Sequence, residues 1–207
     1  MIVERGIQNY RVRAECADLY SRMAANVLDV FEGLPASGTP LAPGTQIRFG
    51  WSLLRLAQEG GDALRVTEPD FPRWPERHWS PTIDHTLKVL AEQTGLLRRL
   101  GVDGVDAFFD QAIIAAPGAL AQPDIFLRRT SSVSPADSGW LLATLDDPEA
   151  LTRDDGLESV LIAGLVAHRP ALLQALTLPP GFIVLFSGDA LEKVFDGAGR
   201  VRLPPDA

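Results

Sequence analysis

The clearest periodic pattern in the chain predicts an amphipathic helix over residues 81–100. Ser80 can cap its start, Pro81 suits its first turn, and Gly101 suits the position just past its end. Two arginines in its last turn favour the helix dipole. One face carries a stripe of side chains at three- and four-residue steps, made of Ile83, Leu87, Leu90, Thr94 and Leu97.

The residues before this helix predict one more helix and a β-hairpin. Alternating apolar residues over 45–56 and 63–68 predict two antiparallel strands joined by a glycine-rich turn. Three prolines within residues 69–75 exclude a helix and a central strand there. A helix is predicted over residues 11–32, with Gly33 after it, from the helical spacing of Cys16, Tyr20, Met23, Val27, Val30 and Phe31.

The residues after residue 101 predict shorter elements. A helix is predicted over 105–115, and strands are predicted over 124–131 and 138–145. Asp155 and Glu158 stand at capping-box spacing, which predicts a mostly apolar helix that begins at Leu157 and runs to Val166. The remaining predicted elements are a short helical turn, a buried strand and a hairpin, over residues 171–176, 182–186 and 194–203.

Helices and strands are segregated along the chain and do not alternate as βαβ units, which predicts an α+β fold. The expected architecture is antiparallel strands and hairpins packed with about four to five helices. A break near residues 118–124 divides the chain into a helix–hairpin–helix module, 1–120, and an α+β domain, 121–207. The linker is short and carries apolar side chains, so the two halves are expected to pack together.

Composition excludes several classes of protein and site. The chain of 207 residues has a net charge of −8, and its basic residues never exceed two in a row, so no nucleic-acid partner is expected. Cys16 is the only cysteine, which excludes an intramolecular disulfide and a cysteine-based zinc site. The N-terminus lacks the build of a signal peptide, and no apolar run reaches the roughly 18 residues of a membrane span. We expect a cytoplasmic protein without a membrane partner.

The sequence offers no clear catalytic constellation. His78 and His85 stand seven residues apart, whereas paired histidines on one helix face usually stand four apart. Ser138 lies in a turn pattern without the surroundings of a nucleophile, and His168 lies where a helix ends. We therefore expect no catalytic, cofactor-binding or metal-binding residue and no cofactor. The alternative is a small hydrolase or transferase that uses His85 or His168 with nearby carboxylates.

The four tryptophans divide into two kinds. Trp51 and Trp140 lie in strand patterns and are expected in the core. Trp74 and Trp79 lie in or beside the proline-rich loop and are candidates for contact with a partner. The same two side chains would serve as anchors if the chain were a structural subunit of a secretion or phage-like assembly.

A group of short motifs stands in the segment from Asp137 onward. They are Asp137-Ser138-Gly139-Trp140, the acidic stretch after it, the helical run with Arg169-Pro170, the turn Leu178-Pro179-Pro180-Gly181 and the late Asp196-Gly197. In these features the segment resembles a bacterial family of polymorphic-toxin immunity proteins, immunity-protein family 33, formerly a domain of unknown function. In that family an aromatic residue and a Gly-Asp-Glu follow the tryptophan, where this chain has residues 141–149 instead. The first 120 residues carry no resemblance.

What the resemblance implies is a cytoplasmic, non-catalytic protein that neutralises a cognate protein toxin by direct binding. Residues 146–158 carry six acidic side chains against one base, Arg153, and such charge steers a basic partner to its binding site. Homodimer formation stays open. The candidate partner-binding residues are Asp146, Asp147, Glu149, Asp154, Trp74 and Trp79.

Overall fold

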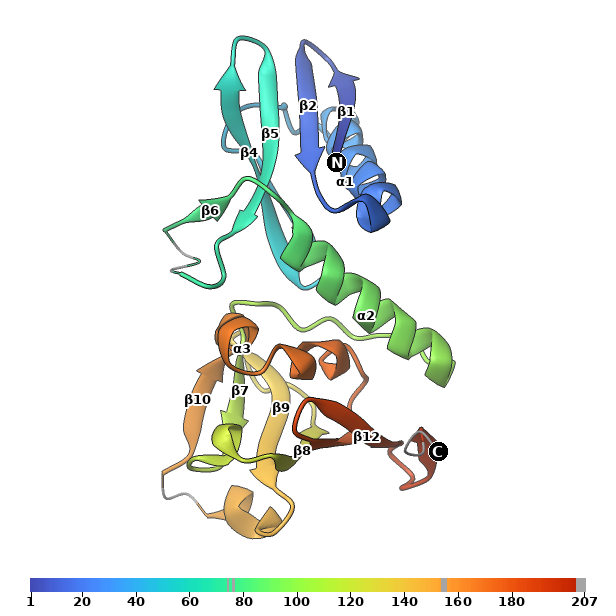
Figure 1. Cartoon of the computed structure of the whole chain (residues 1–207), viewed down its shortest axis with the longest axis vertical. Helices are drawn as coiled ribbons and strands as arrows, with labels where there is room; N and C mark the ends of the chain where they lie inside the picture. The colour runs from blue at the N-terminus through green and yellow to red at the C-terminus, as the bar shows by residue number, and fades with distance from the viewer. Residues whose placement is uncertain (74, 76, 154–155, 204–207) are drawn as a thin grey trace. The chain divides into compact units, whose positions relative to one another are not determined.

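The computed structural model divides the chain into two compact units, Met1–Ala91 and Glu92–Ala207, each with its own β-sheet (Figure 1). The two sheets and their helices confirm the predicted α+β class. The boundary lies within helix α2 (Asp84–Leu100) and differs from the predicted division near residue 120. Residue 120 falls inside the second unit, where the strand just before it, residues 112–115, pairs with two other strands of that unit. The structure describes residues 1–73, 75, 77–153 and 156–203.

The first unit is built on a mixed sheet whose path runs β1-β2-β5-β4-β3, with β6 paired to β5. Only the β2–β5 pair is parallel among its described pairs. The predicted hairpin is confirmed as β4–β5, but its first arm is broken at Gly50, where φ is +57°, into β3 and β4. The strands are β1 (Ile2–Ile7), β2 (Tyr10–Glu15), β3 (Gln46–Phe49), β4 (Ser52–Gly60), β5 (Ala63–Pro69) and β6 (Trp79–Ser80).

Helix α1 (Ser21–Gly33) contributes Val27, Leu28 and Phe31 to the buried core of the first unit. The predicted helix over 11–32 is therefore wrong up to residue 20: residues 11–15 belong to strand β2, residues 18–20 form a 3₁₀ turn, and the α-helix begins at Ser21. Residues 11–16 alternate charged and buried side chains, with Val12, Ala14 and Cys16 in the core. That period of two is the strand signal, and it outweighs the few helical steps that start at Cys16.

Helix α2 confirms the predicted helix but begins at Asp84, and its first turn is held by Glu68 of β5. The fully buried Glu68 carboxylate accepts hydrogen bonds from the backbone N–H groups of His85, at 3.1 Å, and Thr86, at 2.7 Å. It satisfies two N–H groups that a helix start leaves without partners. The predicted cap, Ser80, instead lies in β6.

The second unit holds a seven-stranded sheet in the order β10-β7-β9-β8-β11-β12-β13, in which only β7–β9 is parallel among the described pairs. Strands β8, β9 and β11 confirm three predicted strands, and β12–β13 confirms the last hairpin. The strands are β7 (Ala112–Ala115), β8 (Asp124–Arg129), β9 (Asp137–Thr144), β10 (Glu158–Leu161), β11 (Ile183–Ser187), β12 (Ala190–Phe195) and β13 (Val201–Leu203).

Two predicted helices of the second unit are wrong in whole or in part. Residues 105–111 lie outside regular elements, and 112–115 form β7, whose residues alternate between buried Ile113 and Ala115 and half-buried neighbours. The helix predicted from Leu157 begins as strand β10, and only α3 (Ile162–His168) is helical. In both segments a short apolar run fits either element, and pairing with a neighbouring strand decides. The predicted turn at 171–176 is confirmed by η5 (Pro170–Ala175), a 3₁₀ helix.

Arg129, at the end of β8, joins two loops to the second sheet. It is only 4% exposed, and burial lowers its pKa to about 10, so it stays charged near neutral pH. The guanidinium carbon lies 5.6 Å from the ring centre of the fully buried Trp140. The guanidinium donates hydrogen bonds of 2.6–3.0 Å to the carbonyl oxygens of Val105, Asp106, Leu176 and Leu178.

Replacing Arg129 with Leu should lower the free energy of unfolding of the second unit by about 3 kcal/mol, because buried carbonyl groups lose their donors. The control is Arg128→Leu, since Arg128 is the exposed neighbour on the same strand and its loss should change little. Urea denaturation of both variants measures the difference. Equal stability of the two variants would contradict this role for Arg129.

The first unit should be more stable below about pH 6 than at pH 8 through one group, His85. Its Nδ1 lies 3.2 Å from Glu68 Oε1, and this hydrogen bond raises the pKa of His85 against the opposing effects of burial and Lys88. A raised pKa in the folded state gives stability that is complete below about 6.5 and is lost as the pH rises through the folded value. Melting temperatures across this range should vary less in His85→Gln than in the natural sequence.

Candidate partner-binding surface

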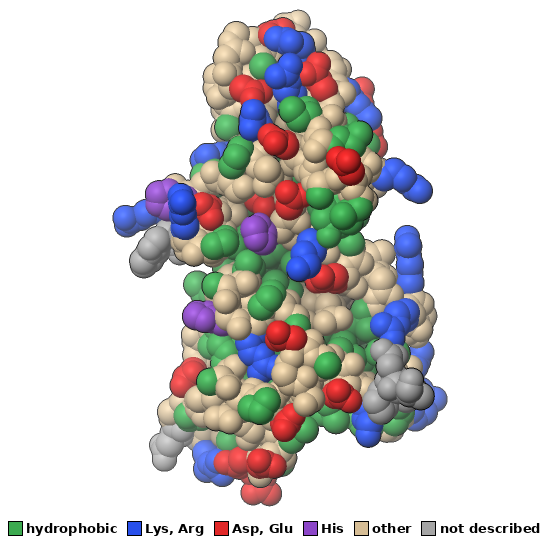
Figure 2. Space-filling model, viewed as in Figure 1, with side chains coloured by type: hydrophobic (Ala, Val, Ile, Leu, Met, Phe, Trp, Pro, Cys, Tyr) green, Lys and Arg blue, Asp and Glu red, His purple; other side chains and the backbone are tan. Residues whose placement is uncertain are grey.

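The negative charge of the chain is concentrated in the second unit. Residues 1–91 carry 10 basic and 11 acidic side chains, a net charge of −1. Residues 92–207 carry 9 basic and 16 acidic side chains, a net charge of −7. Figure 2 shows acidic side chains gathered at the end of this unit where the chain passes from β9 to β10. A charged partner would therefore meet very different fields at the two units.

The acidic segment after β9 is an ordered, exposed turn of 3₁₀ helix, η4 (Pro148–Thr152). Asp146, Asp147 and Glu149 are all exposed, as their sequence context predicts. The Asp147 carboxylate forms an ion pair with Arg153, so one of these charges is already balanced at the surface. Exposed pairs of this kind contribute about 0–1 kcal/mol, so the charges are available for a partner at small cost to folding.

Asp146 shares a pocket of about 330 Å³ with Asp124 of β8. Pro117 lines the same pocket, and the next residue, Gly118, donates its backbone N–H to the Glu158 carboxylate at 3.2 Å. Three acidic side chains from separate segments are thus gathered around the turn at 117–118. Strand pairing thus brings Asp124, which lies outside the predicted acidic segment, together with Asp146 and Glu158, which lie within it.

Two predicted contact residues, Asp154 and Trp74, lie outside the described residues, as does Asp155. Trp79 belongs to the first unit, where it is half-buried in β6. The guanidinium of Arg55 lies over its ring, 3.9 Å from the ring centre. One face of this indole is therefore already occupied by an intramolecular cation–π contact.

The motif Asp137-Ser138-Gly139-Trp140 is structural at each position. The Asp137 carboxylate accepts hydrogen bonds from the N–H groups of Gly139, at 2.8 Å, and Val133, at 3.0 Å. The predicted turn is shifted, because residues 137–139 begin strand β9 and the turn lies just before them, at 135–136. The Ser138 hydroxyl donates to Ala112 O at 2.6 Å and is buried, which argues against a nucleophile. Gly139 has φ of +76°, and a Cβ there would lie 2.3 Å from Thr130 O, so no other residue fits.

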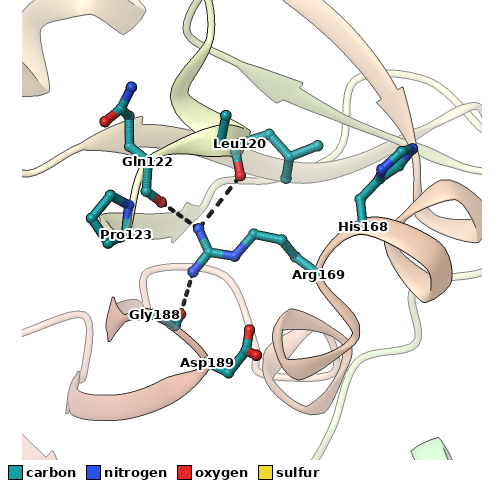
Figure 3. Close-up of a pocket in the computed structure, with 8 residues that line it drawn as sticks. Leu120, Gln122, Pro123, His168, Arg169, Gly188 and Asp189 are labelled. Atoms are coloured by element: carbon teal, nitrogen blue, oxygen red, sulfur yellow. Dashed lines mark hydrogen bonds between the residues drawn. The ribbon is translucent and has the colours of Figure 1, made fainter.

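Arg169 forms the floor of a second pocket of about 330 Å³ (Figure 3). Its guanidinium donates to the carbonyl oxygens of Gln122 and Gly188, so the side chain joins the segment before β8 to the β11–β12 turn. His168 lies at the edge of this pocket, and Figure 3 shows its ring directed away from Arg169. The geometry gives Arg169 a structural task and leaves His168 without a hydrogen-bonded carboxylate among the described residues.

His85, the other histidine considered for catalysis, contacts the Glu68 carboxylate. That carboxylate also holds the start of α2, so it is committed to folding. Among residues 1–73, 75, 77–153 and 156–203, no group of three or more His, Cys, Asp or Glu side chains is placed to hold a metal ion. No helix in that part of the chain combines the length and apolar character that a membrane crossing requires.

Arg129 and Arg169 are both buried, and no structural task was predicted for either. Arg129 follows Ile125 and Leu127 at a period of two, and this alternation predicts that it faces the same buried side. Arg169 follows the buried Leu165 by one helical turn, which is a comparable signal. Such signals are easily passed over, because arginines are seldom fully buried.

Comparison with known families places this geometry in context. A family model described as the Imm33-like domain matches residues 92–197, just over half of the chain. Searches of curated proteins and of solved structures returned no match. The matched range covers most of the second unit, including β7 to β12 and the acidic turn, and confirms the resemblance of the C-terminal half to immunity-protein family 33. The chain belongs to the Imm33-like domain family.

Proposed function

We propose that the chain is a non-catalytic immunity protein that binds and neutralises a cognate bacterial toxin in the cytoplasm. The observation that carries this proposal is that the excess negative charge lies in the same unit that the family model matches. The unit that the Imm33-like model matches holds a net charge of −7, against −1 in the other unit. A binding protein needs a complementary surface and no reactive group, and the acidic turn 146–149 with Asp124 and Glu158 offers such a surface.

The electrostatic surface acts first on the rate of encounter. A concentrated field of one sign attracts an oppositely charged partner and can raise association rates well above those of neutral surfaces. The exposed carboxylates around 117–118 and 146–149 are therefore assigned to steering a basic toxin surface. Their long-range effect is screened beyond about 10 Å at 0.1 M salt, so binding should depend on ionic strength.

The primary test of the function is rescue of growth. Expression of the product of the adjacent gene should be toxic to bacteria, and co-expression of this chain should restore growth. Purified chain should also bind that product directly, because the proposal is inhibition by binding. An adjacent product that is harmless, or toxicity that persists with folded chain present, would contradict the function.

The variant Asp146→Asn, Asp147→Asn, Glu149→Gln should associate with the toxin about tenfold more slowly at low salt, with little change in dissociation. The difference should shrink as salt is added. Stopped-flow or surface-based kinetics at two salt concentrations measures both rates. Melting temperature should change little, since the replaced charges are exposed.

The matched control is Asp18→Asn, Asp29→Asn, Glu32→Gln in the first unit, which changes the net charge by the same amount. These three side chains are 90%, 57% and 55% exposed. If both triple variants slow association equally, total charge matters and the acidic turn has no special part. If neither does, the turn is an ordinary solvated loop.

A further inference from the structure

Strand β10 lies at one edge of the seven-stranded sheet, next to β7 alone among the described strands. The register pairs Glu158 with Ala115 and Val160 with Ile113. One residue beyond the strand, Ile162 N donates to Gln111 O at 2.9 Å in the same register. In antiparallel pairs hydrogen-bonded residues alternate, so Val160 and Glu158 also bond to β7. The backbone of Ser159 and the N–H of Leu161 therefore point to the open edge.

The other side of β7 supports this assignment independently. Ala112 N and Ala116 N donate to carbonyl groups on the β9 side, at 2.9 and 2.8 Å. The even-numbered residues of β7 thus bond toward β9, which leaves Ile113 and Ala115 to bond toward β10. Ser159, opposite Ile114, has no hydrogen-bond partner within the described part of the chain. Its N–H and C=O are therefore available to pair with a further strand.

The exposed edge also carries the side chains of a binding strand. Leu161 is 50% exposed, more than any other described leucine of this unit. Glu158 is exposed at the other end of the strand, beside the acidic side chains around residues 117–118. The opposite edge of the sheet, β13, has a comparable apolar residue in Val201, 53% exposed, but it is flanked by Arg200 and Arg202. The two edges therefore differ in the sign of their charge.

We propose that an extended, basic segment of the cognate toxin pairs with β10 as an added strand, an inference that rests on the proposed function. The free N–H and C=O groups at Ser159 supply main-chain hydrogen bonds, and the side chains supply selectivity. Charge favours the toxin over a second copy of this chain as the occupant. Pairing of two β10 strands about a twofold axis brings two acidic surfaces together, whereas a basic segment complements one.

The register of the added strand also predicts which side chains the toxin segment places opposite β10. Cross-strand neighbours on the same face interact directly, so the toxin residue opposite Glu158 is Lys or Arg, and the residue opposite Leu161 is apolar. These two positions lie three residues apart and therefore on opposite faces of the added strand.

The first test compares Leu161→Lys with Val201→Lys, two equal changes on opposite edges of one sheet. Lysine on an edge strand disfavours pairing and repels a basic segment, so Leu161→Lys should weaken binding of the adjacent gene's product by at least about tenfold. Val201→Lys should bind as the natural chain does. Titration calorimetry gives both dissociation constants, and circular dichroism checks that both variants are folded. Equal effects of the two variants would overturn the proposal.

The second test addresses the backbone. Ser159→Pro removes the outward N–H and leaves the bonds to β7 intact, a placement that edge strands tolerate. It should weaken binding about tenfold, whereas Ser159→Ala, which keeps the N–H, should not. Unchanged binding by a folded Ser159→Pro overturns the added strand while leaving the immunity function standing. Absence of binding by the natural chain instead overturns the function itself.

Size-exclusion chromatography with light scattering tests whether β10 pairs instead with a second copy of this chain. If the natural chain dimerises, and Leu161→Lys makes it monomeric without affecting binding of the adjacent gene's product, the strand pairs with a second copy and the proposal is wrong. A monomer that is unaffected by the substitution agrees with pairing to the toxin.

Discussion

The second unit depends on hydrogen bonds from Arg129 to backbone carbonyl groups that would otherwise lack donors. The loops around residues 105 and 177 bring carbonyl oxygens into the interior, where an unpaired polar group costs about 1–3 kcal/mol. Arg129 supplies the donors from a single planar group, and the neighbouring Trp140 adds its Nε1–H to Leu176 O at 2.9 Å. A leucine there would be shorter and would satisfy none of them. The cluster thereby ties both loops to β8 and β9, which pair with each other.

The residues of the family motif also serve to hold the strands of the second unit together. Asp137 and Gly139 shape the turn that leads into β9, Ser138 joins that strand to β7, and Trp140 meets Arg129. The motif therefore specifies a scaffold, and the surface that meets a partner can vary around it. The departure from the family pattern begins within β9, at residues 141–144, and continues through the exposed residues 145–149, where surface segments commonly vary between relatives.

The sequence predicted the parts of the fold that depend on local pattern. The stripe of α2, the β4–β5 hairpin and strands β8, β9 and β11 were found because their periods are clear and their ends carry turn residues. At residues 11–16 the prediction failed although β2 pairs with its sequence neighbour β1, because helical steps that start at Cys16 were extended back over an alternating strand pattern. The failures at residues 112–115 and 158–161 share another cause, since each is a short strand whose partners are distant in sequence. Local spacing cannot report a pairing decided elsewhere in the chain. The acidic turn was visible as composition, but its joining with Asp124 and Glu158 required the pairing of strands.

Helix α2 begins in one unit and ends in the other, and this has a consequence for the order of folding. The family match begins at residue 92, in the middle of that helix. The Imm33-like domain therefore contains only the second half of α2. Starting a helix is unfavourable, whereas extending one is not. During synthesis the first unit, with Glu68 and the first turns of α2, leaves the ribosome earlier. The first turns of α2, which precede the family domain, can thus nucleate the helix, so that its last turns form by extension.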